Sequence, residues 1–332
     1  MSAIATKDLT YHDWKAKLSL ELKGKDLTSY DYVWDGVSIS PFDERTGIPI
    51  NRFPKNKIGW LIGARCDLKN ESILHALQFG AEIISIESTE KIKNFPAIFN
   101  DVRLDWISLE LDTNDKINIK SLYAYLKKQD YLNTSGAVIT AFENQYDLYS
   151  EYSSLLPGYK FLSLDCLASD TAAAIANKFS LLIELIERLA DADSIQRVLT
   201  NMVIRFTPGH DLVLTISMIR ALRLVWMHIL KSFNRDIDLP VTIHSYIKND
   251  GIKSTDNMIL STAASMACVT GGTDALFIEP PDPLKQHKAW QLKLQHIMKE
   301  ESQLDKEDNL IAGAYTIERL STIIAERIWE KI

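Results

Sequence analysis

Short apolar runs alternate along the chain with longer segments in which apolar residues recur every three or four positions. The first pattern is typical of buried strands and the second of amphipathic helices. Eight such runs are predicted as strands, at 58–64, 82–88, 105–112, 136–142, 160–166, 201–206, 240–246 and 275–278. Segment 171–190 shows the helical pattern most clearly, with Ile175, Phe179, Leu182 and Ile186 on one stripe. Strands that alternate with helices pair in parallel, and eight units in about 275 residues predict a closed (β/α)8 barrel.

An open, doubly wound sheet is the alternative fold for the same alternation. Such sheets usually carry a glycine-rich phosphate loop directly after a strand, as GxGxxG or GxxxxGK[ST], and no predicted strand is followed by either pattern. The pair Gly271-Gly272 precedes its strand, so it ends a helix and does not form a phosphate loop. The segment from Asn257 to Asp282 is therefore the last helix–strand step, and it closes the barrel.

The first 56 residues do not follow this repeat. Trp14, Leu18 and Leu22 are spaced four apart among polar residues, which predicts an amphipathic helix over 10–24 that Gly24 ends. Two short β runs around Asp35-Gly36 predict a hairpin over 32–40. We therefore expect an N-terminal arm over 1–56 and a barrel over 57–332. We expect the apolar stripe of the arm to pack either on its own barrel or on a second chain, and we predict that the arm takes part in subunit packing.

Composition narrows the classes of partner. The net charge is −7 and the pI about 5.6, so a broad basic face for nucleic acid is not expected. The N-terminus has no apolar signal core and no window of about 20 apolar residues occurs, which predicts a cytoplasmic protein without a membrane segment. Cys66, Cys166 and Cys268 are too few and too widely spaced for a disulfide framework or a zinc site. They are expected to be small buried residues, with a reactive thiol at Cys166 as the alternative.

Function in a barrel of this kind is expected at the C-terminal ends of the strands. Four residues there are candidates for substrate contact: Arg205 on the sixth strand, His210 in the following loop, and His244 and Tyr246 on the seventh. Arg205 needs an anionic ligand or a carboxylate such as Asp165 or Glu279, whereas a loop or core histidine often has no ligand at all. Five acids mark predicted strand ends, at Glu87, Asp112, Glu143, Asp165 and Glu279. Strand-end acids commonly cap the next helix, and no HxH, HExxH or paired-carboxylate spacing predicts a metal site.

Several segments, in order from end to end, resemble a known family. The segment DWKAKLSLELKGKDLTSYDYVWDGVSISPF (13–42) is similar to the N-terminal arm of the methylmalonyl-CoA mutases, and 257–282 to their NMLRTTTEAxAAxLGGAD stretch. KEESQL at 299–304, AGAY at 312–315, Glu318 and Trp329 echo the family's QEESxL, PAGGSY, Glu and Ala-Trp features. The chain resembles the small subunit of these enzymes more than the large one.

The resemblance implies an acyl-CoA barrel threaded by its substrate, and a cobalamin domain that supplies the adenosyl radical for succinyl-CoA/methylmalonyl-CoA isomerisation. Nothing up to Ile332 matches the DxHxxG motif whose histidine ligates cobalt, so this chain is not expected to bind a cofactor or to contain that domain. Segment 203–210 reads VIRFTPGH where catalytic members carry a Tyr-His pair, and 244–247 reads HSYI where they carry a Thr-Ser-Arg type motif. No catalytic residue is therefore carried over.

Taken together, the resemblance predicts an isomerase subunit of doubtful activity of its own, paired as a heterodimer with a large catalytic subunit that holds adenosylcobalamin. Two alternatives stay open. One is a catalytic barrel served by a separate cobalamin-binding chain. The other is an orphan barrel that holds an acyl-CoA-like or phosphate ligand through Arg205 and His210.

Overall fold

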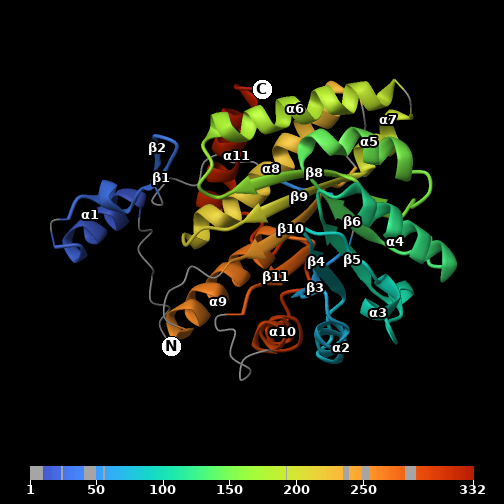
Figure 1. Cartoon of the computed structure of the whole chain (residues 1–332). Helices are drawn as coiled ribbons and strands as arrows, with labels where there is room; N and C mark the ends of the chain where they lie inside the picture. The colour runs from blue at the N-terminus through green and yellow to red at the C-terminus, as the bar shows by residue number, and fades with distance from the viewer. Residues whose placement is uncertain are drawn as a thin grey trace.

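The computed structural model describes residues 10–23, 25–40, 50–54, 57–191, 193–234, 239–248, 254–280 and 289–332. A ring of parallel strands lies at the centre, with helices around it and a separate N-terminal arm (Figure 1). The strands of the main sheet are β3 (Leu61–Cys66), β4 (Ile83–Glu87), β5 (Ser108–Asp112), β6 (Gly136–Ile139), β7 (Tyr159–Lys160), β8 (Leu162–Leu167), β9 (Met202–Thr207), β10 (Thr242–Ile247) and β11 (Ala275–Ile278).

The sheet closes on itself through one broken strand. Its order is β7-β6-β5-β4-β3-β11-β10-β9-β8, so β7 and β8 lie at its two edges. These two are consecutive halves of one extended segment, separated only by Phe161. The backbone N–H of Phe161 donates to Oδ1 of Asn201 at 2.6 Å, and Nδ2 of Asn201 donates to the carbonyl of Tyr159 at 2.9 Å. The side chain of Asn201 thus satisfies the backbone at the break, and the predicted (β/α)8 barrel is confirmed.

Alternation along the strands divides their side chains between two faces, as the period of two requires. Outward residues such as Ile84, Leu109 and Ile204 join the large core between strands and helices. Inward apolar residues form two small separate clusters, which consist of Leu61, Ile83, Tyr246, Ala275 and Phe277, and of Ala137, Ile139 and Val203. The rest of the interior is polar or charged, and this polar part contains the candidate site.

The helices of the barrel follow the predicted segments closely. They are α2 (Asn70–Gln78), α3 (Phe95–Ile98), α4 (Lys116–Lys128), α5 (Phe142–Tyr152), α6 (Ala172–Ala190), α8 (Leu212–Ser232), α9 (Ser254–Gly271), α10 (Trp290–His296) and α11 (Tyr315–Trp329). Short elements that the sequence did not predict are the 3-10 turns η1 (Leu27–Tyr30) and η2 (Leu104–Trp106), α7 (Ile195–Thr200) and the π-helical turn η4 (Ile297–Glu301).

Three predicted bounds are wrong at the ends. The first strand begins at Leu61 and not at residue 58, and the third begins at Ser108 because η2 precedes it. The fourth ends at Ile139, and α5 begins at Phe142, so Glu143 lies in a helix and not at a strand end. Part of the helix expected over 284–304, up to residue 288, lies outside the described residues, as do Gly24, Pro41, Pro49, Pro281 and Asp282.

Helix α8 is long and apolar enough, by length and composition, to cross a membrane. The prediction that no apolar window of this length occurs is therefore wrong for α8. Two thirds of the apolar window is buried, and α8 packs between α9 and α11. A helix that is buried on most sides must be apolar on most sides, so its composition follows from its place in the core.

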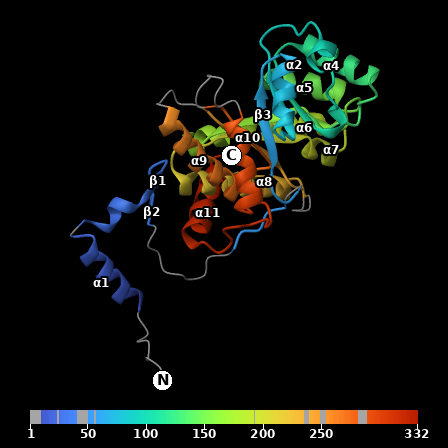
Figure 2. The ribbon, with the colours of Figure 1, turned by 90° about the horizontal axis from the view of Figure 1, so that it is seen from below.

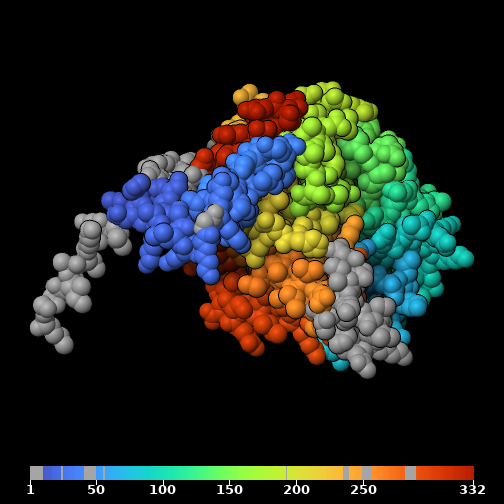
Figure 3. Space-filling view, turned by 90° about the vertical axis from the view of Figure 1, so that its left-hand side faces the viewer, coloured from blue at the N-terminus to red at the C-terminus, as the bar shows by residue number. Residues whose placement is uncertain are grey.

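The N-terminal arm has a docked part and an undocked part. The hairpin of β1 (Tyr32–Trp34) and β2 (Val37–Ile39) turns at Asp35-Gly36, both at positive φ, which confirms the predicted turn. It packs on the body through Trp34 and Ile39, and Oδ2 of Asp35 accepts from the N–H of Ala172 at the start of α6. Helix α1 (Tyr11–Glu21) buries no residue and projects from the body (Figures 2 and 3).

Residues 50–54 are fixed to the barrel by a buried polar cluster. Glu318 of α11 pairs with Arg220 of α8 at 2.7 Å, and both side chains are at most 2% exposed. Glu318 also accepts from the N–H of Asn51 at 3.1 Å, and the ring of Phe53 lies 4.9 Å from the guanidinium of Arg220. The boundary at residue 56 stays a prediction, since residues 55–56 are outside the described chain.

Candidate functional site

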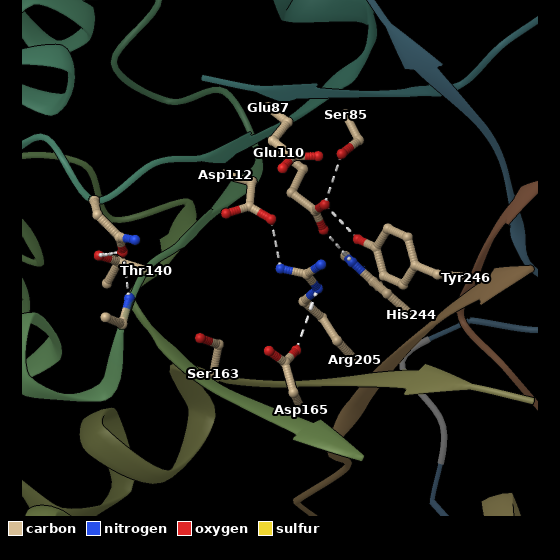
Figure 4. A network of polar contacts seen from close by, with 12 residues as sticks. Ser85, Glu87, Glu110, Asp112, Thr140, Ser163, Asp165, Arg205, His244 and Tyr246 are labelled. Atoms are coloured by element: carbon tan, nitrogen blue, oxygen red, sulfur yellow. Dashed lines mark hydrogen bonds and ion pairs between the residues drawn. The ribbon is translucent and has the colours of Figure 1, made fainter. Parts of the chain in front are cut away.

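A network of charged and polar side chains crosses the inside of the barrel in its C-terminal half (Figure 4). The register of the strands sets its members side by side: Ser85 pairs with Glu110, Arg205 with Asp165, and His244 with Arg205. Alternation then turns all of these residues to the interior, where they meet partners from the opposite wall.

Glu110, at the middle of β5, is the centre of the network. Its side chain is fully buried and accepts hydrogen bonds from Ser85 at 2.9 Å and from the hydroxyl of Tyr246. Its other oxygen lies 2.8 Å from Nδ1 of His244 on β10, which faces β5 across the barrel. Burial opposes ionisation, but the hydrogen bonds and charges of these partners outweigh it and hold the pKa of Glu110 below its ordinary value.

Arg205 is held between two carboxylates. Its Nη1 donates to Asp112 at 2.6 Å, and its Nε lies 3.3 Å from Asp165, an ion pair without hydrogen-bond geometry. The guanidinium also stacks 4.8 Å from the ring centroid of Tyr246. Burial disfavours the guanidinium charge, but Tyr246 and the two acids raise the pKa of Arg205 overall. Burial raises the pKa of Asp112 although Arg205 lies beside it. Formation of the Asp112–Arg205 pair therefore carries a desolvation cost.

A pair of aromatic rings fills the barrel axis beside this network. Tyr246 and Phe277 stack with centroids 4.7 Å apart and planes at 8°, and their strands pair at these two residues. Phe277 in turn pairs with Gly63, where an added Cβ would lie 2.6 Å from the Phe277 ring and 2.5 Å from the Leu276 carbonyl. Gly63 is therefore the residue that lets the Phe277 ring enter the barrel.

The C-terminal rim carries a second set of paired charges. Arg65 at the end of β3 donates to Glu87 at 2.6 Å and to Glu279. These three residues line a cavity of about 490 Å³ together with Cys66, Asp67, Leu68, Ser85 and Thr89. Glu279, which the sequence analysis considered as a partner of Arg205, thus pairs with a different arginine, whereas the alternative partner Asp165 is the one found.

The N-terminal end of the barrel contains a cavity of about 250 Å³. Its lining is Lys57, Gly59, Trp60, Leu61, Ile83, Ser108, Ser135, Gly136, Gly158, Lys160, Thr242, His244 and Asp274. These residues stand at the beginnings of the strands, and only His244 lies deeper. The cavity therefore ends at the Glu110 network, and His244 belongs to both.

The four candidate residues from the sequence do not form one site. Arg205, His244 and Tyr246 belong to the interior network, whereas His210 is exposed and lines a separate cavity of about 150 Å³ between the β9–α8 loop and α9. Whether any of them contacts a substrate stays a prediction. Among the described residues no group of three or more His, Cys, Asp or Glu side chains is placed to hold a metal ion.

The cysteines do not contribute reactive thiols to this region. Burial raises the pKa of each of the three to about 12. Cys166 is fully buried, so the alternative of a reactive thiol at that position is wrong.

Glu110, Phe277, Gly63 and Lys160 were missed from the sequence. The segment Asp105–Asp112 alternates, and its alternation places Glu110 on the same face as Ser108 and Asp112, so a charge in the interior was readable there. The role of Gly63 was not readable, because it depends on a ring contributed by a strand more than 200 residues later.

The sequence of the chain also matches known proteins. The family model for methylmalonyl-CoA mutase matches residues 167–332, half of the chain. Over 96% of its length the chain is 21% identical to the methylmalonyl-CoA mutase small subunit of Porphyromonas gingivalis, and it spans 61% of that protein.

Solved structures give weaker matches. A dihydropteroate synthase of Yersinia pestis aligns with a TM-score of 0.39 at 11% identity, over 82% of this chain and 99% of that one. The tryptophan synthase alpha chain of Legionella pneumophila aligns with a TM-score of 0.35 at 7% identity, over 80% of this chain and 92% of that one. Scores of this size carry no argument about function. The family match does, and the chain belongs to the methylmalonyl-CoA mutase family.

Proposed function

We propose that this chain is a small-subunit-like component of an adenosylcobalamin-dependent methylmalonyl-CoA mutase. In this proposal the chain has no catalytic activity of its own and stabilises a large subunit that interconverts succinyl-CoA and methylmalonyl-CoA in the cytoplasm. The similarity to a protein named as a small subunit supports such a partner.

The observation that carries the proposal is the filled barrel axis. A substrate that threads the barrel needs an open path between the two mouths. Here the Tyr246–Phe277 stack and the bond from Glu110 to His244 occupy that path, and each ring is at most 4% exposed. Removing these contacts to admit a ligand would leave the buried Glu110 with only the hydrogen bond from Ser85, which is energetically costly.

The described side chains of the C-terminal mouth support the assignment of the corrin cofactor to another chain. The arginines of this mouth are already paired with carboxylates: Arg65 with Glu87 and Glu279, and Arg205 with Asp112 and Asp165. In the described part of the chain the only histidine beside this network is His244, whose Nδ1 is engaged by Glu110. Adenosylcobalamin is therefore assigned by the proposal to the large subunit.

The arm supplies a surface for that partner. Helix α1 buries nothing, and it exposes Trp14 by 43% and Leu20 by 80%. Trp14 and Leu20 lie on different sides of the helix, so the structure shows no single apolar stripe on α1. A helix of 11 residues is poorly stable alone in water, and packing of these exposed apolar side chains on a second chain would stabilise it.

Co-purification with a cobalamin-binding mutase chain tests the proposal. We expect a stoichiometric complex, mutase turnover only in the presence of the large chain, and weaker association of a Trp14→Ala/Leu20→Asp variant. A monodisperse chain that does not bind the large subunit at micromolar concentration would contradict the proposal. A large chain whose own barrel is inactive provides the opposite test. If the mixture of that chain with this one still isomerises the substrate, the barrel of this chain is catalytic.

The N-terminal cavity favours one second candidate, a barrel that binds an acyl-CoA-like ligand. It offers two lysines, an apolar wall and the ring of His244. Calorimetry with an acyl-CoA, comparing the wild type with Lys57→Ala and Arg205→Ala, separates the ends. If Lys57→Ala loses binding and Arg205→Ala does not, the ligand binds in this cavity. If neither the wild type nor the variants give a heat of binding, this candidate is excluded.

A further inference from the structure

Lys160 is a partly buried cation that lies outside the interior network. It ends β7, next to the break in the fifth strand, and its side chain lines the N-terminal cavity. Its Nζ donates to the carbonyl of Thr200 at 2.5 Å. Within the described part of the chain, no carboxylate lies within ion-pair distance of this amine. The chain thus places an uncompensated amine in the wall of a cavity.

The surroundings of the amine favour its neutral form. Burial lowers the pKa of Lys160 to about 8, against a weak opposing effect of Asp274. At pH 7 roughly a tenth of such an amine is neutral, compared with less than a thousandth of an ordinary lysine. A neutral amine in an apolar pocket is the form in which lysine acts as a nucleophile.

The cavity admits only a small reaction partner. Its volume is about 250 Å³, its wall includes Trp60, Leu61 and Ile83, and it is closed at the inner end by His244. A short acyl group fits a space of this volume.

We propose that Lys160 is an acyl-acceptor site, at which the ε-amine takes a short acyl group from a thioester that enters the N-terminal cavity. The amine attacks the thioester carbonyl, a C–N bond forms and the C–S bond breaks. The thiolate leaves and takes the proton released by the nitrogen, so the products are an amide and a thiol. The choice of a thioester as donor rests on the proposed function in acyl-CoA metabolism.

Acylation removes the positive charge of Lys160 and leaves its nitrogen a single N–H group for the hydrogen bond to the Thr200 carbonyl. It also places the acyl chain in the cavity that ends at His244, so the modified chain can no longer admit another ligand there. Lys160 would thus report the local supply of acyl thioester as a covalent mark inside the barrel.

The test uses the full chain and the propionyl thioester of N-acetylcysteamine. Peptide mass spectrometry gives the initial rate of propionylation at each lysine between pH 6 and 11. We expect Lys160 to react at least about tenfold faster at pH 7 than the exposed lysines of α1, with a rate that levels off above about pH 8. Lys160→Arg should remove this fast phase, and Lys128→Arg, at the exposed end of α4 and outside the cavity, should leave it unchanged.

Labelling of Lys160 no faster than that of Lys17, or a rate that still rises steeply between pH 9 and 10, would overturn the proposal. A fast phase that persists in Lys160→Arg would do the same. Because these rates are measured on the isolated chain, they do not depend on a large subunit. Failure of complex formation and failure of acylation are therefore separate outcomes.

Discussion

The two ends of the barrel are built on opposite principles. At the C-terminal end the described charges of the interior are ion-paired or hydrogen-bonded, and two aromatic rings close the axis. At the N-terminal end there is a cavity of about 250 Å³, with a lysine that has no carboxylate partner among the described residues. Enzymes of this architecture usually place reactive groups at the first end and stabilising contacts at the second.

The barrel therefore differs at both ends from the usual ligand-binding barrel. The inward-facing polar residues at the C-terminal end satisfy one another, and these contacts stabilise the fold. The cavity at the C-terminal rim is lined by the paired charges of Arg65, Glu87 and Glu279, whereas the N-terminal cavity has an apolar wall and the amine of Lys160, which no described carboxylate pairs. A role as a stabilising subunit requires the first feature and does not require the second, which is why the cavity carries a separate proposal.

The largest expected effect comes from removing the centre of the C-terminal network. Glu110→Ala leaves His244, Tyr246 and Ser85 without their common acceptor in a fully buried place. Breaking a buried pair in this way costs about 3–5 kcal/mol, and urea unfolding should show that loss. Glu110→Gln keeps the shape and one acceptor, so it should lose less. A loss below about 1 kcal/mol for the alanine variant would mean that the network does not stabilise the barrel.

Filling the axis further is expected to cost less. In Gly63→Ala the new methyl group meets the Leu276 carbonyl and the Phe277 ring at 2.5 and 2.6 Å. Overpacking of this kind costs about 1–3 kcal/mol in unfolding experiments. The double variant Gly63→Ala/Phe277→Leu should recover only part of it, since the carbonyl does not move away with the ring. An unchanged midpoint in Gly63→Ala would show that the axis is looser than these contacts indicate.

A matched pH experiment examines the N-terminal end. The pKa of Lys160 lies at about 8 in the folded chain, below the ordinary value that applies when it is unfolded. Between these two values the unfolded chain binds more protons, so Lys160 lowers stability below pH 8 and this cost disappears as the pH rises toward 10.5. Lys160→Met should therefore be more stable than the wild type at pH 7, by roughly 1–2 kcal/mol, and equal to it near pH 10.5. Parallel stability curves for the two proteins would contradict the lowered pKa.

The barrel could be predicted from the sequence because its main strands and helices show the local spacing of apolar residues that is typical of each. The stripe of Ile175, Phe179, Leu182 and Ile186 is buried as predicted, and Asp35-Gly36 forms the predicted turn. Local signals also give the polarity of the inward face, as the alternation around Glu110 shows.

The pairing of the interior charges was not accessible in the same way. Arg205 meets Asp112 across 93 positions, and His244 meets Glu110 across 134, so both contacts depend on the closure of the whole sheet. The break at Phe161 was missed for a related reason. The predicted strand at 160–166 joins two halves that pair with different neighbours, and only the closed sheet distinguishes them.

The smallest expected effect concerns the rim of the C-terminal network. Asp165 is 68% exposed and contacts Arg205 at 3.3 Å without hydrogen-bond geometry, while Asp112 holds the same guanidinium at 2.6 Å from a largely buried position. Asp165→Asn should therefore change the free energy of unfolding by less than about 1 kcal/mol, because solvent screens an exposed pair. Asp112→Asn should cost more, since it leaves Arg205 with only the exposed partner. If Asp165→Asn were the more destabilising of the two, the exposed Asp165 would be the main partner of Arg205. Contacts at the solvent edge, and not the buried network, would then hold the C-terminal mouth closed.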